Sequence, residues 1–394
     1  MKLFNPDFPL WGQAFRPMFL AAAGFSAFAM LLWGLSLSGM IRLPVDNPVF
    51  WHSHEMLFGF AMAVVAGFLL TAVQNWTGRR AVNGKPLLLL TLVWLSGRIA
   101  MLSSAFLPWW LIACIDMAFI PLVALFFWQL VFAVRQKRNY FFAPVLLLML
   151  VCNGSMHWGN AHADGALVLW ASHSVSWLML VFITIIGGRI LPMFTANGTM
   201  TPKVESLPWL EKSVLISTWL IAALYLTRLD SLLPGWVMSL MLVLGVVAHA
   251  VRIFRLNLRI TLPVPLLWSL HLAYWFIPLG LLLLALHYAG APWSFSTALH
   301  ALTAGAIGGM IIAMIARVSL GHSGRPLQPA RMMSAAFAMV LLAALLRSLL
   351  VALQPQAVSL LFALTSALWV MAFSIFVLVY WSVLISPRPD GRPG

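Results

Sequence analysis

The chain has 394 residues, of which 62% are hydrophobic and only 8% are charged, and its mean hydropathy is +0.97. This composition excludes a soluble globular protein, because most of the surface must face lipid rather than water. The net charge of +14 by itself would suit a nucleic-acid-binding protein, but the basic residues are spread over short segments along the whole chain. We therefore expect an integral membrane protein that contacts membrane lipid and no nucleic acid.

About twelve apolar stretches follow one another along the chain, and each is long enough for a spanning helix of roughly 20 residues. They lie near residues 16–41, 54–76, 86–104, 107–134, 140–159, 165–188, 212–230, 232–255, 264–288, 297–318, 330–352 and 357–385. Little of the chain is left for a domain outside the membrane. The sequence therefore predicts an all-α, polytopic membrane fold of about 12 transmembrane helices, forming a single transmembrane domain over residues 1–394.

The orientation in the membrane follows from the basic residues. Most of the 23 Lys and Arg residues fall in every second loop, beginning with Lys2 and Arg16 and ending with Arg388 and Arg392. Because cytoplasmic loops carry the excess of Lys and Arg, this alternation predicts that both termini are cytoplasmic. Four arginines lie instead near the opposite ends of predicted helices: Arg42, Arg98, Arg228 and Arg347.

The two cysteines, Cys114 and Cys152, both lie inside apolar stretches. A disulfide framework is therefore not expected, and the sequence predicts two buried free thiols.

The ten histidines lie mostly on the predicted outer side. His52, His54 and Glu55 open the second apolar stretch, and the H-x-H-E spacing offers two imidazoles and a carboxylate within one helical turn. Ionisable groups inside a membrane are expensive and are functional candidates by default. We interpret the two histidines as metal or cofactor ligands and Glu55 as a catalytic group that delivers protons. The alternative is that these histidines are solvated at the membrane interface.

Three even-numbered helices share one layout: an outer histidine, an apolar run interrupted by glycine, and an inner arginine. They start near Trp51, Trp170 and Ala298, so the layout recurs every four helices. In a pseudo-threefold arrangement the histidine-bearing ends would converge, and His173 and His300 could then hold haem or copper together with the second helix. The alternative for each is a neutral histidine bonded to a neighbouring helix.

Two further histidines, His157 and His162, flank the outer end of the fifth helix and are additional candidate metal ligands; the alternative is that they are loop residues. Arg98 and Asp116 lie at similar depth on adjacent helices, which suits a buried ion pair. A second interpretation of Arg98 is cofactor binding, because an arginine at that depth can pair with the carboxylates of a haem. Four other histidines are more typical of structural positions: His249, His271, His287 and His322.

Several long runs resemble one protein family. These are F15-R-P-M-F-L, W51-H-S-H-E-M-L-F-G-F-A-M-A-V-V-A-G-F-L-L-T-A-V-Q-N-W-T-G-R, G187-G-R-I-L-P-M-F-T and H300-A-L-T-A-G-A-I-G-G-M-I-I-A-M-I-A-R-V-S-L-G-H-S-G-R. They are similar to the NnrS family, over essentially the whole chain. The resemblance implies a bacterial inner (cytoplasmic) membrane protein that contains haem b and copper and is linked to denitrification and to protection from nitrosative stress.

The helix count, the predicted termini and the outer histidines on helices two, six and ten are also similar to the central subunit of haem-copper oxidases. The sequence departs from that pattern because its seventh helix lacks a histidine pair and its tenth has a single histidine. One b-type haem and one copper suit this inventory better than two haems.

The function expected from these observations is a haem- and copper-binding membrane protein that binds or converts nitric oxide near the periplasmic side. If it is an enzyme, it is a haem/copper-dependent oxidoreductase acting on nitric oxide, with an electron donor that the sequence does not name. Two alternatives stay open. One is a 12-helix secondary transporter, and the other is a haem- or copper-handling factor without catalysis.

Overall fold

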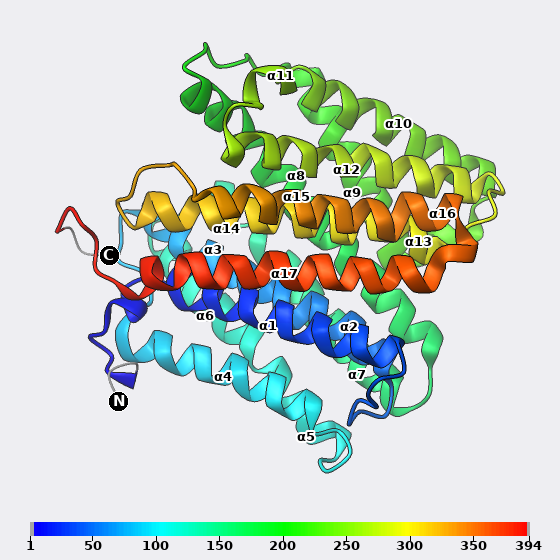
Figure 1. Ribbon diagram of the computed structural model, residues 1–394, viewed down its shortest axis with the longest axis horizontal. Coiled ribbons are helices and arrows are strands. Elements are labelled where there is room, and N and C mark those ends of the chain that lie inside the picture. The colour runs from blue at the N-terminus through cyan, green and yellow to red at the C-terminus, as the bar shows by residue number, and fades with distance from the viewer. Residues whose placement is uncertain (1–3, 392–394) are drawn as a thin grey trace. The chain divides into compact units, whose positions relative to one another are not determined.

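The computed structural model describes residues 4–391, and all regular structure in this part of the chain is helical (Figure 1). Within these residues, 12 helices are long and apolar enough to cross a membrane. The predicted all-α polytopic class is therefore confirmed. The cytoplasmic location of the termini stays a prediction.

The chain packs as two compact units. The first unit comprises residues 1–172, 315–327 and 373–394, and the second comprises residues 173–314 and 328–372. The long helices α8, α14 and α17 contribute residues to both. Whether the chain forms a single domain, as the sequence predicts, is not tested by this division.

The first unit contains the N-terminal five spans. Its helices are η2 (Pro9–Trp11), α1 (Phe15–Leu37), α2 (Pro48–His54), η3 (Glu55–Ala61), α3 (Met62–Thr77), α4 (Gly84–Leu102), α5 (Trp109–Met117), α6 (Phe119–Ala133), η4 (Lys137–Asn139) and α7 (Phe142–Ala161). The start of α1 and the end of α17 lie at the same end of this unit (Figure 1).

Helix termini in the first unit follow local sequence signals. The second span begins at Pro48, where the side chain of Asn47 accepts a hydrogen bond from the backbone N–H of Phe50 at 3.1 Å. Asparagine caps and a proline in the first turn both favour a helix start. The span ends at Gly78, whose φ of 66° lies in the left-handed region that glycine tolerates.

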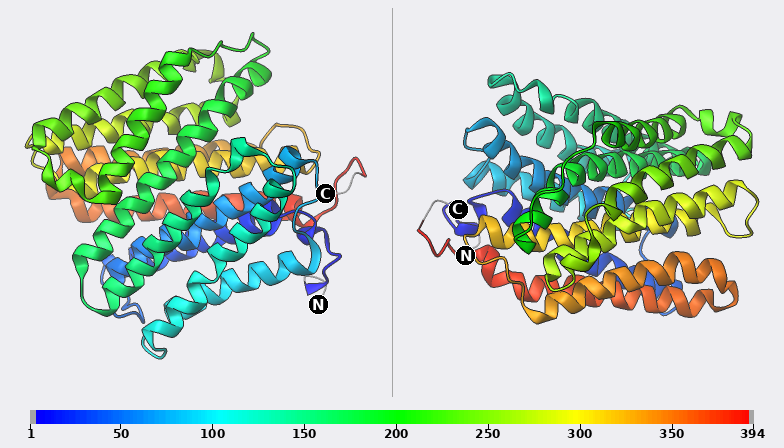
Figure 2. Two further views of the ribbon diagram at one scale, coloured as in Figure 1. Left: turned by 180° about the vertical axis from the view of Figure 1, so that it is seen from behind. Right: turned by 90° about the horizontal axis from the view of Figure 1, so that it is seen from above.

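The second unit is built mainly from the later spans. Its helices are α8 (Gly165–Thr199), α9 (Pro208–Thr227), η5 (Leu229–Leu232), α10 (Gly235–Phe254), α11 (Leu258–Thr261), α12 (Pro265–Tyr288), α13 (Phe295–His300), η6 (Ala301–Gly308), α14 (Gly309–His322), α15 (Arg331–Leu345), η7 (Leu346–Leu350), α16 (Val351–Leu353), η8 (Pro355–Ala357) and α17 (Val358–Ile385). Helices α10 and α12 run side by side (Figures 1 and 2).

Glycines let the helices of each unit approach closely. In the first unit a Cβ on Gly67 of α3 would lie 2.8 Å from the Cβ of Met18 on α1. In the second unit a Cβ on Gly305 of η6 would lie 2.1 Å from the ring of Phe276 on α12. Small residues at such contacts are the usual means of packing helices in a membrane, where no hydrophobic force drives helices together.

The structure corrects three details of the sequence prediction. The sixth span continues to Thr199 with Pro192 inside it, rather than ending at residue 188, so Arg189 lies within a helix. The second span begins at Pro48, six residues earlier than predicted, which places His52 inside it. Cys114 is exposed on the surface of its helix, while Cys152 is buried as expected.

His54 and His300 are each followed directly by π-helical backbone. Segment η3 follows His54 and segment η6 follows His300. A third π-helical segment, η7, contains Arg347. Short π-helical turns in longer helices change the direction in which side chains project, and they occur frequently at functional sites.

Candidate metal centre

Three potential metal ligands come together in the first unit. His54, Asp116 and His157 each offer one ligand atom, and these atoms all lie within 4.8 Å of one another. The side chains come from α2, α5 and α7 and expose 5% of their surface or less. Asp116 Oδ2 lies at the centre, 3.2 Å from His54 Nε2 and 3.1 Å from His157 Nε2.

Further polar groups surround these three residues. The guanidinium of Arg98 bridges the two carboxylates, because it donates through Nη1 to Glu55 Oε1 and through Nη2 to Asp116 Oδ1. Asn153 donates to Asp116 Oδ2 at 2.8 Å, and its Oδ1 lies 2.9 Å from His54 Nε2. We call these six residues the outer cluster: His54, Glu55, Arg98, Asp116, Asn153 and His157. The predicted Arg98–Asp116 ion pair is thus confirmed.

The local sequence explains how the outer cluster forms. Asn153 and His157 are four residues apart and therefore share one face of α7. Gly97 lets α5 approach α4 at the cluster, because a Cβ there would lie 3.2 Å from the Cα of Asp116. Gly59 leaves room for the ion pair, since its Cβ would lie 2.8 Å from Arg98 Nη1 and 2.9 Å from Glu55 Oε2.

Hydrogen bonding fixes the charge of the outer cluster. His54 Nδ1 lies 3.0 Å from Glu55 Oε1 and Nε2 lies 2.9 Å from the side-chain oxygen Oδ1 of Asn153, so both ring nitrogens face acceptors, as in an imidazolium. The imidazolium and Arg98 then balance the two carboxylates. This pairing makes the cluster neutral, which stabilises it because an unpaired charge in a buried site is strongly unfavourable. A metal cation bound by His54 would take the place of a proton.

Two predicted ligands lie outside the outer cluster. The ring of His52 is stacked on Trp33, with ring centroids 4.4 Å apart. His162 is exposed, is stacked on Trp158 and donates from Nδ1 to the backbone carbonyl of Trp158 at 2.9 Å. The H-x-H-E motif is therefore divided: His54 and Glu55 enter the cluster, and His52 contacts an aromatic ring.

In the second unit, His173 lies among aromatic side chains. Its ring centroid is 4.6 Å from that of Phe295, which in turn lies 5.9 Å from the ring of His287 and 5.8 Å from that of Tyr225. Among the described residues no hydrogen bond to His173 is found. A partly buried imidazole next to flat aromatic rings could hold a haem.

His300 lies beside an arginine in the same unit. Its Nδ1 donates to the backbone carbonyl of Ser296 at 2.6 Å. Ligand histidines commonly make such a bond to a carbonyl, because it fixes the ring orientation. Arg347 Nη2 lies 3.4 Å from Ser296 Oγ, and no described residue forms a hydrogen bond with its buried Nη1.

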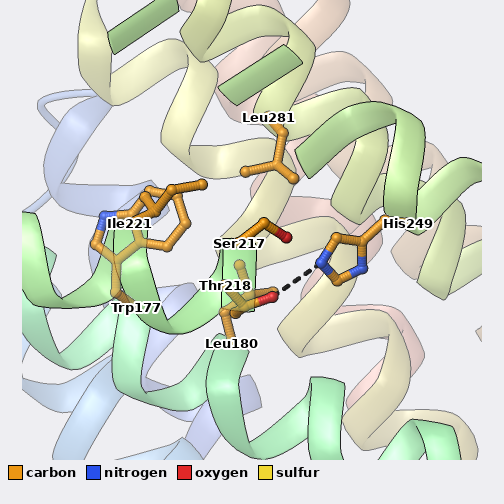
Figure 3. A pocket seen from close by; sticks show the side chains of 7 residues that line it. All are labelled: Trp177, Leu180, Ser217, Thr218, Ile221, His249 and Leu281. Carbon is orange, nitrogen blue, oxygen red and sulfur yellow. Dashed lines mark hydrogen bonds between the residues drawn. The ribbon is translucent and has the colours of Figure 1, made fainter. Parts of the chain in front are cut away.

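The inner part of the second unit contains a separate chain of hydrogen bonds. Arg252 pairs with Glu211 and donates to the hydroxyl of Tyr274 at 3.1 Å. Tyr274 donates to His249 Nδ1 at 2.9 Å, and His249 Nε2 donates to Thr218 Oγ1 at 3.0 Å (Figure 3). These contacts are consistent with the structural role expected for His249, which stays a prediction.

The cavity beside Thr218 and His249 is small. Its empty space is about 160 Å³, part of which is open to the outside, and it is lined mostly by apolar side chains, including Trp177, Ile221 and Leu281 (Figure 3). Ligand pockets typically enclose roughly 300–1,000 Å³. We therefore interpret this cavity as a gap in helix packing rather than as a cofactor site.

The sequence analysis did not propose a ligand or orienting role for two members of the outer cluster. Asp116 was interpreted as an ion-pair partner of Arg98 and not as a ligand, and Asn153 was not singled out. A signal for Asn153 was present, because it precedes His157 by four residues in an apolar helix. The convergence of helices two, six and ten involves both units and stays a prediction.

Residues 9–388 of the chain match the protein family described as NnrS protein. The match extends from η2 to the residues just beyond α17 and includes all six residues of the outer cluster. No curated protein matches the chain.

Proposed function

Because the chain belongs to the NnrS family, we propose that it is a haem- and copper-binding protein of the bacterial inner membrane that binds or converts nitric oxide near the periplasmic side. Family membership suggests a role in the response to nitric oxide. The 12 apolar helices make the chain a multi-pass membrane protein. Nitric oxide is small and uncharged, so it can reach such a protein through the lipid.

The outer cluster is the observation that carries this proposal. Two imidazoles and a carboxylate are donors that suit copper(II), which binds nitrogen and oxygen ligands more tightly than other first-row divalent metals. His54, Asp116 and His157 would hold the copper. Glu55, Arg98 and Asn153 would orient these ligands, as groups around a metal site generally do.

The second unit supplies residues that fit a haem. His173 and His300 offer imidazole nitrogens, and Arg347 has an unpaired buried Nη1 that suits a haem carboxylate. Arg98 is less suited to that role, because both of its terminal nitrogens bind carboxylates of the chain. Bound haem iron and copper would supply redox-active metals to which nitric oxide can bind.

Glu55 is placed to handle protons. Its Oε1 accepts hydrogen bonds from Arg98 and His54, while its buried Oε2 has no partner among the described residues. This free oxygen can accept a proton and pass it to a neighbouring group. A reduction of nitric oxide would use such a proton, together with electrons from a separate donor.

The test of this proposal compares two histidines of the same helix end. Because His157 belongs to the outer cluster and His162 does not, we expect His157→Ala to lose most of the bound copper and His162→Ala to keep it. Metal analysis and the electron paramagnetic resonance signal of copper(II) on purified protein measure the difference. Equal copper contents in both variants would contradict the assignment.

Turnover separates the two functional versions of the proposal. A nitric oxide electrode records consumption of nitric oxide by the reduced, metal-loaded protein. Consumption that stops in His157→Ala supports conversion of nitric oxide, whereas copper binding without any consumption supports a binding or metal-handling role.

A further inference from the structure

Three segments of the first unit meet at the end opposite the outer cluster. They are the start of α1, the end of α14 with the loop after it, and the end of α17 (Figure 1). The ring of Phe15 lies 5.7 Å from that of His322, and Arg388 Nη1 donates to the carbonyl of His322 at 2.7 Å. Arg16 Nη1 donates to the carbonyl of Ser386 at 2.6 Å.

Arg16 is fully buried and only partly paired. Its side chain exposes 0% of its surface, and its two hydrogen bonds, to the carbonyls of Leu384 and Ser386, both come from Nη1. Nε and Nη2 have no hydrogen-bond partner among residues 4–391. These two nitrogens form the edge with which a guanidinium binds an oxyanion through two parallel hydrogen bonds. A buried charge left in this state is strongly unfavourable.

Two buried serines lie at this end as well. Ser319 is in the last turn of α14 and Ser323 follows that helix directly, with its backbone N–H donating to the carbonyl of Ser319 at 3.2 Å. Both expose 0% of their surface, and within the described part of the chain their hydroxyl groups make no hydrogen bond. Serines in helices generally bond to the carbonyl one turn earlier. Two neighbouring serines that do not are therefore available to bind another group.

The charge at this end is positive. Arg325 and Arg388 lie close enough to Arg16 to repel its charge, and Arg325 Nη1 lies 3.5 Å from the carbonyl of Ser323. Asp390 pairs with Arg388. One carboxylate against three guanidinium groups leaves a surplus of positive charge that favours an anion.

We propose that Arg16, Ser319 and Ser323 form a binding site for a phosphate group. A phosphate presents three or more acceptor oxygens, which match the guanidinium edge and the two hydroxyls, whereas a carboxylate presents only two. Arg325 and Arg388 supply further positive charge. The group can belong to an anionic lipid or to free phosphate, since the chemistry is shared. The inference uses none of the residues proposed to bind haem or copper.

The first measurement is thermal unfolding of the full-length protein in a neutral detergent. We expect inorganic phosphate to raise the unfolding temperature relative to chloride at equal ionic strength. In parallel, lipid nanodiscs of phosphatidylglycerol are compared with nanodiscs of phosphatidylcholine. Stabilisation by inorganic phosphate identifies free phosphate as the ligand, and stabilisation by phosphatidylglycerol alone identifies the lipid.

Two variants and one control locate the site. Arg16→Gln removes the guanidinium, and the double variant Ser319→Ala with Ser323→Ala removes the hydroxyls without changing the charge. Each should weaken the binding of phosphate about tenfold or more, because each removes hydrogen bonds between the protein and a charged group. Arg79→Gln, which changes an exposed arginine in the loop after α3, should leave binding unchanged.

The serine variant keeps the test decisive if Arg16→Gln does not fold. Stabilisation that persists in the serine variant, or that is lost equally in Arg79→Gln, would overturn the proposal. The absence of any stabilisation by either inorganic phosphate or phosphatidylglycerol in the unaltered protein would overturn it as well.

Discussion

Asp116 connects most of the outer cluster. One of its oxygens accepts from Arg98, and the other lies within 3.2 Å of His54, Asn153 and His157. An ionised carboxylate within a membrane helix raises the free energy of the folded protein unless it is paired. The number of its partners therefore makes Asp116 the residue on which the geometry of the cluster most depends.

The substitution Asp116→Asn tests this dependence. It keeps the shape of the side chain but leaves Arg98 and His54 with one carboxylate between them. Breaking a buried ion pair in this way costs about 3–5 kcal/mol, so we expect the free energy of unfolding to fall by about that amount. Equilibrium unfolding in mixed detergent micelles measures the change.

The control for this substitution is Asp164→Asn. Asp164 is exposed and accepts a hydrogen bond from the backbone N–H of Leu167 at the start of α8. Asparagine caps a helix about as well as aspartate, so stability should hardly change. A loss of stability in Asp116→Asn no greater than that of the control would show that the cluster does not hold the helices together.

Some of these residues could be predicted from the sequence and others could not. The pairing of Arg98 with Asp116 was predicted correctly. Opposite charges at equal depth on adjacent apolar helices are expected to pair, because an unpaired buried charge is strongly unfavourable. Glu55 joins them because the second span begins at Pro48 and continues as π-helix, and neither feature shows in hydropathy. The side chains that histidines contact depend on helix rotation, so His52 and His54 could not be separated in advance.

At the scale of single helices, the π-helical segment η3 brings the outer cluster together. It begins at Glu55 and contains Gly59, against which Arg98 lies. The indole N–H of Trp94 donates to the carbonyl of Gly59 at 2.9 Å, which fixes α4 against this segment. The segment therefore needs a residue without a side chain at position 59.

Substitution of this glycine by alanine should disrupt the cluster. A methyl group on Gly59 would lie 2.6 Å from the ring of Phe25 and 2.8 Å from Arg98 Nη1, so Arg98 must move away from Glu55. We expect Gly59→Ala to lose copper and to unfold at a lower temperature. Gly24→Ala in α1 is the matched control, because its nearest neighbour would be Val377 at 3.9 Å.

Metal analysis and thermal unfolding of these two glycine variants make the comparison. If Gly59→Ala retained its copper and its unfolding temperature as well as Gly24→Ala, the close contact between η3 and Arg98 would not matter for the site.

Helix existence could be predicted from the sequence, but helix ends could not. All 12 spans were predicted, because a run of about 20 apolar residues in a chain of this composition is expected to form a membrane-spanning helix. The extension of α8 to Thr199 was missed, because Arg189 and Pro192 suggested an end. Proline is tolerated inside a membrane helix, where neighbouring groups satisfy the freed carbonyl.

At the scale of the whole molecule, the polar side chains proposed to bind ligands form separate groups within the two units. The outer cluster and the phosphate site lie at opposite ends of the first unit, and the residues that fit a haem lie in the second. The alternation of basic loops predicts that the outer cluster faces the periplasm. The pseudo-threefold arrangement concerns the placement of the two units and stays a prediction.

The acidic residues within the spans bear on the alternative function as a secondary transporter. The sequence offered Asp116 as a clear intramembrane acid, and the structure adds Glu55 and Glu211 within helices that can span the membrane. Each of the three pairs with a buried arginine, either Arg98 or Arg252. Acids held in this way suit a fixed site better than a carrier that releases its coupling ion.

The most direct test of the account is an optical spectrum with metal analysis of the purified protein, oxidised, reduced with dithionite, and reduced with nitric oxide added. We expect a reduced b-type haem spectrum that shifts with nitric oxide, together with iron and copper in stoichiometric amounts. A folded protein without metal and without absorption in the visible range would contradict the proposed function.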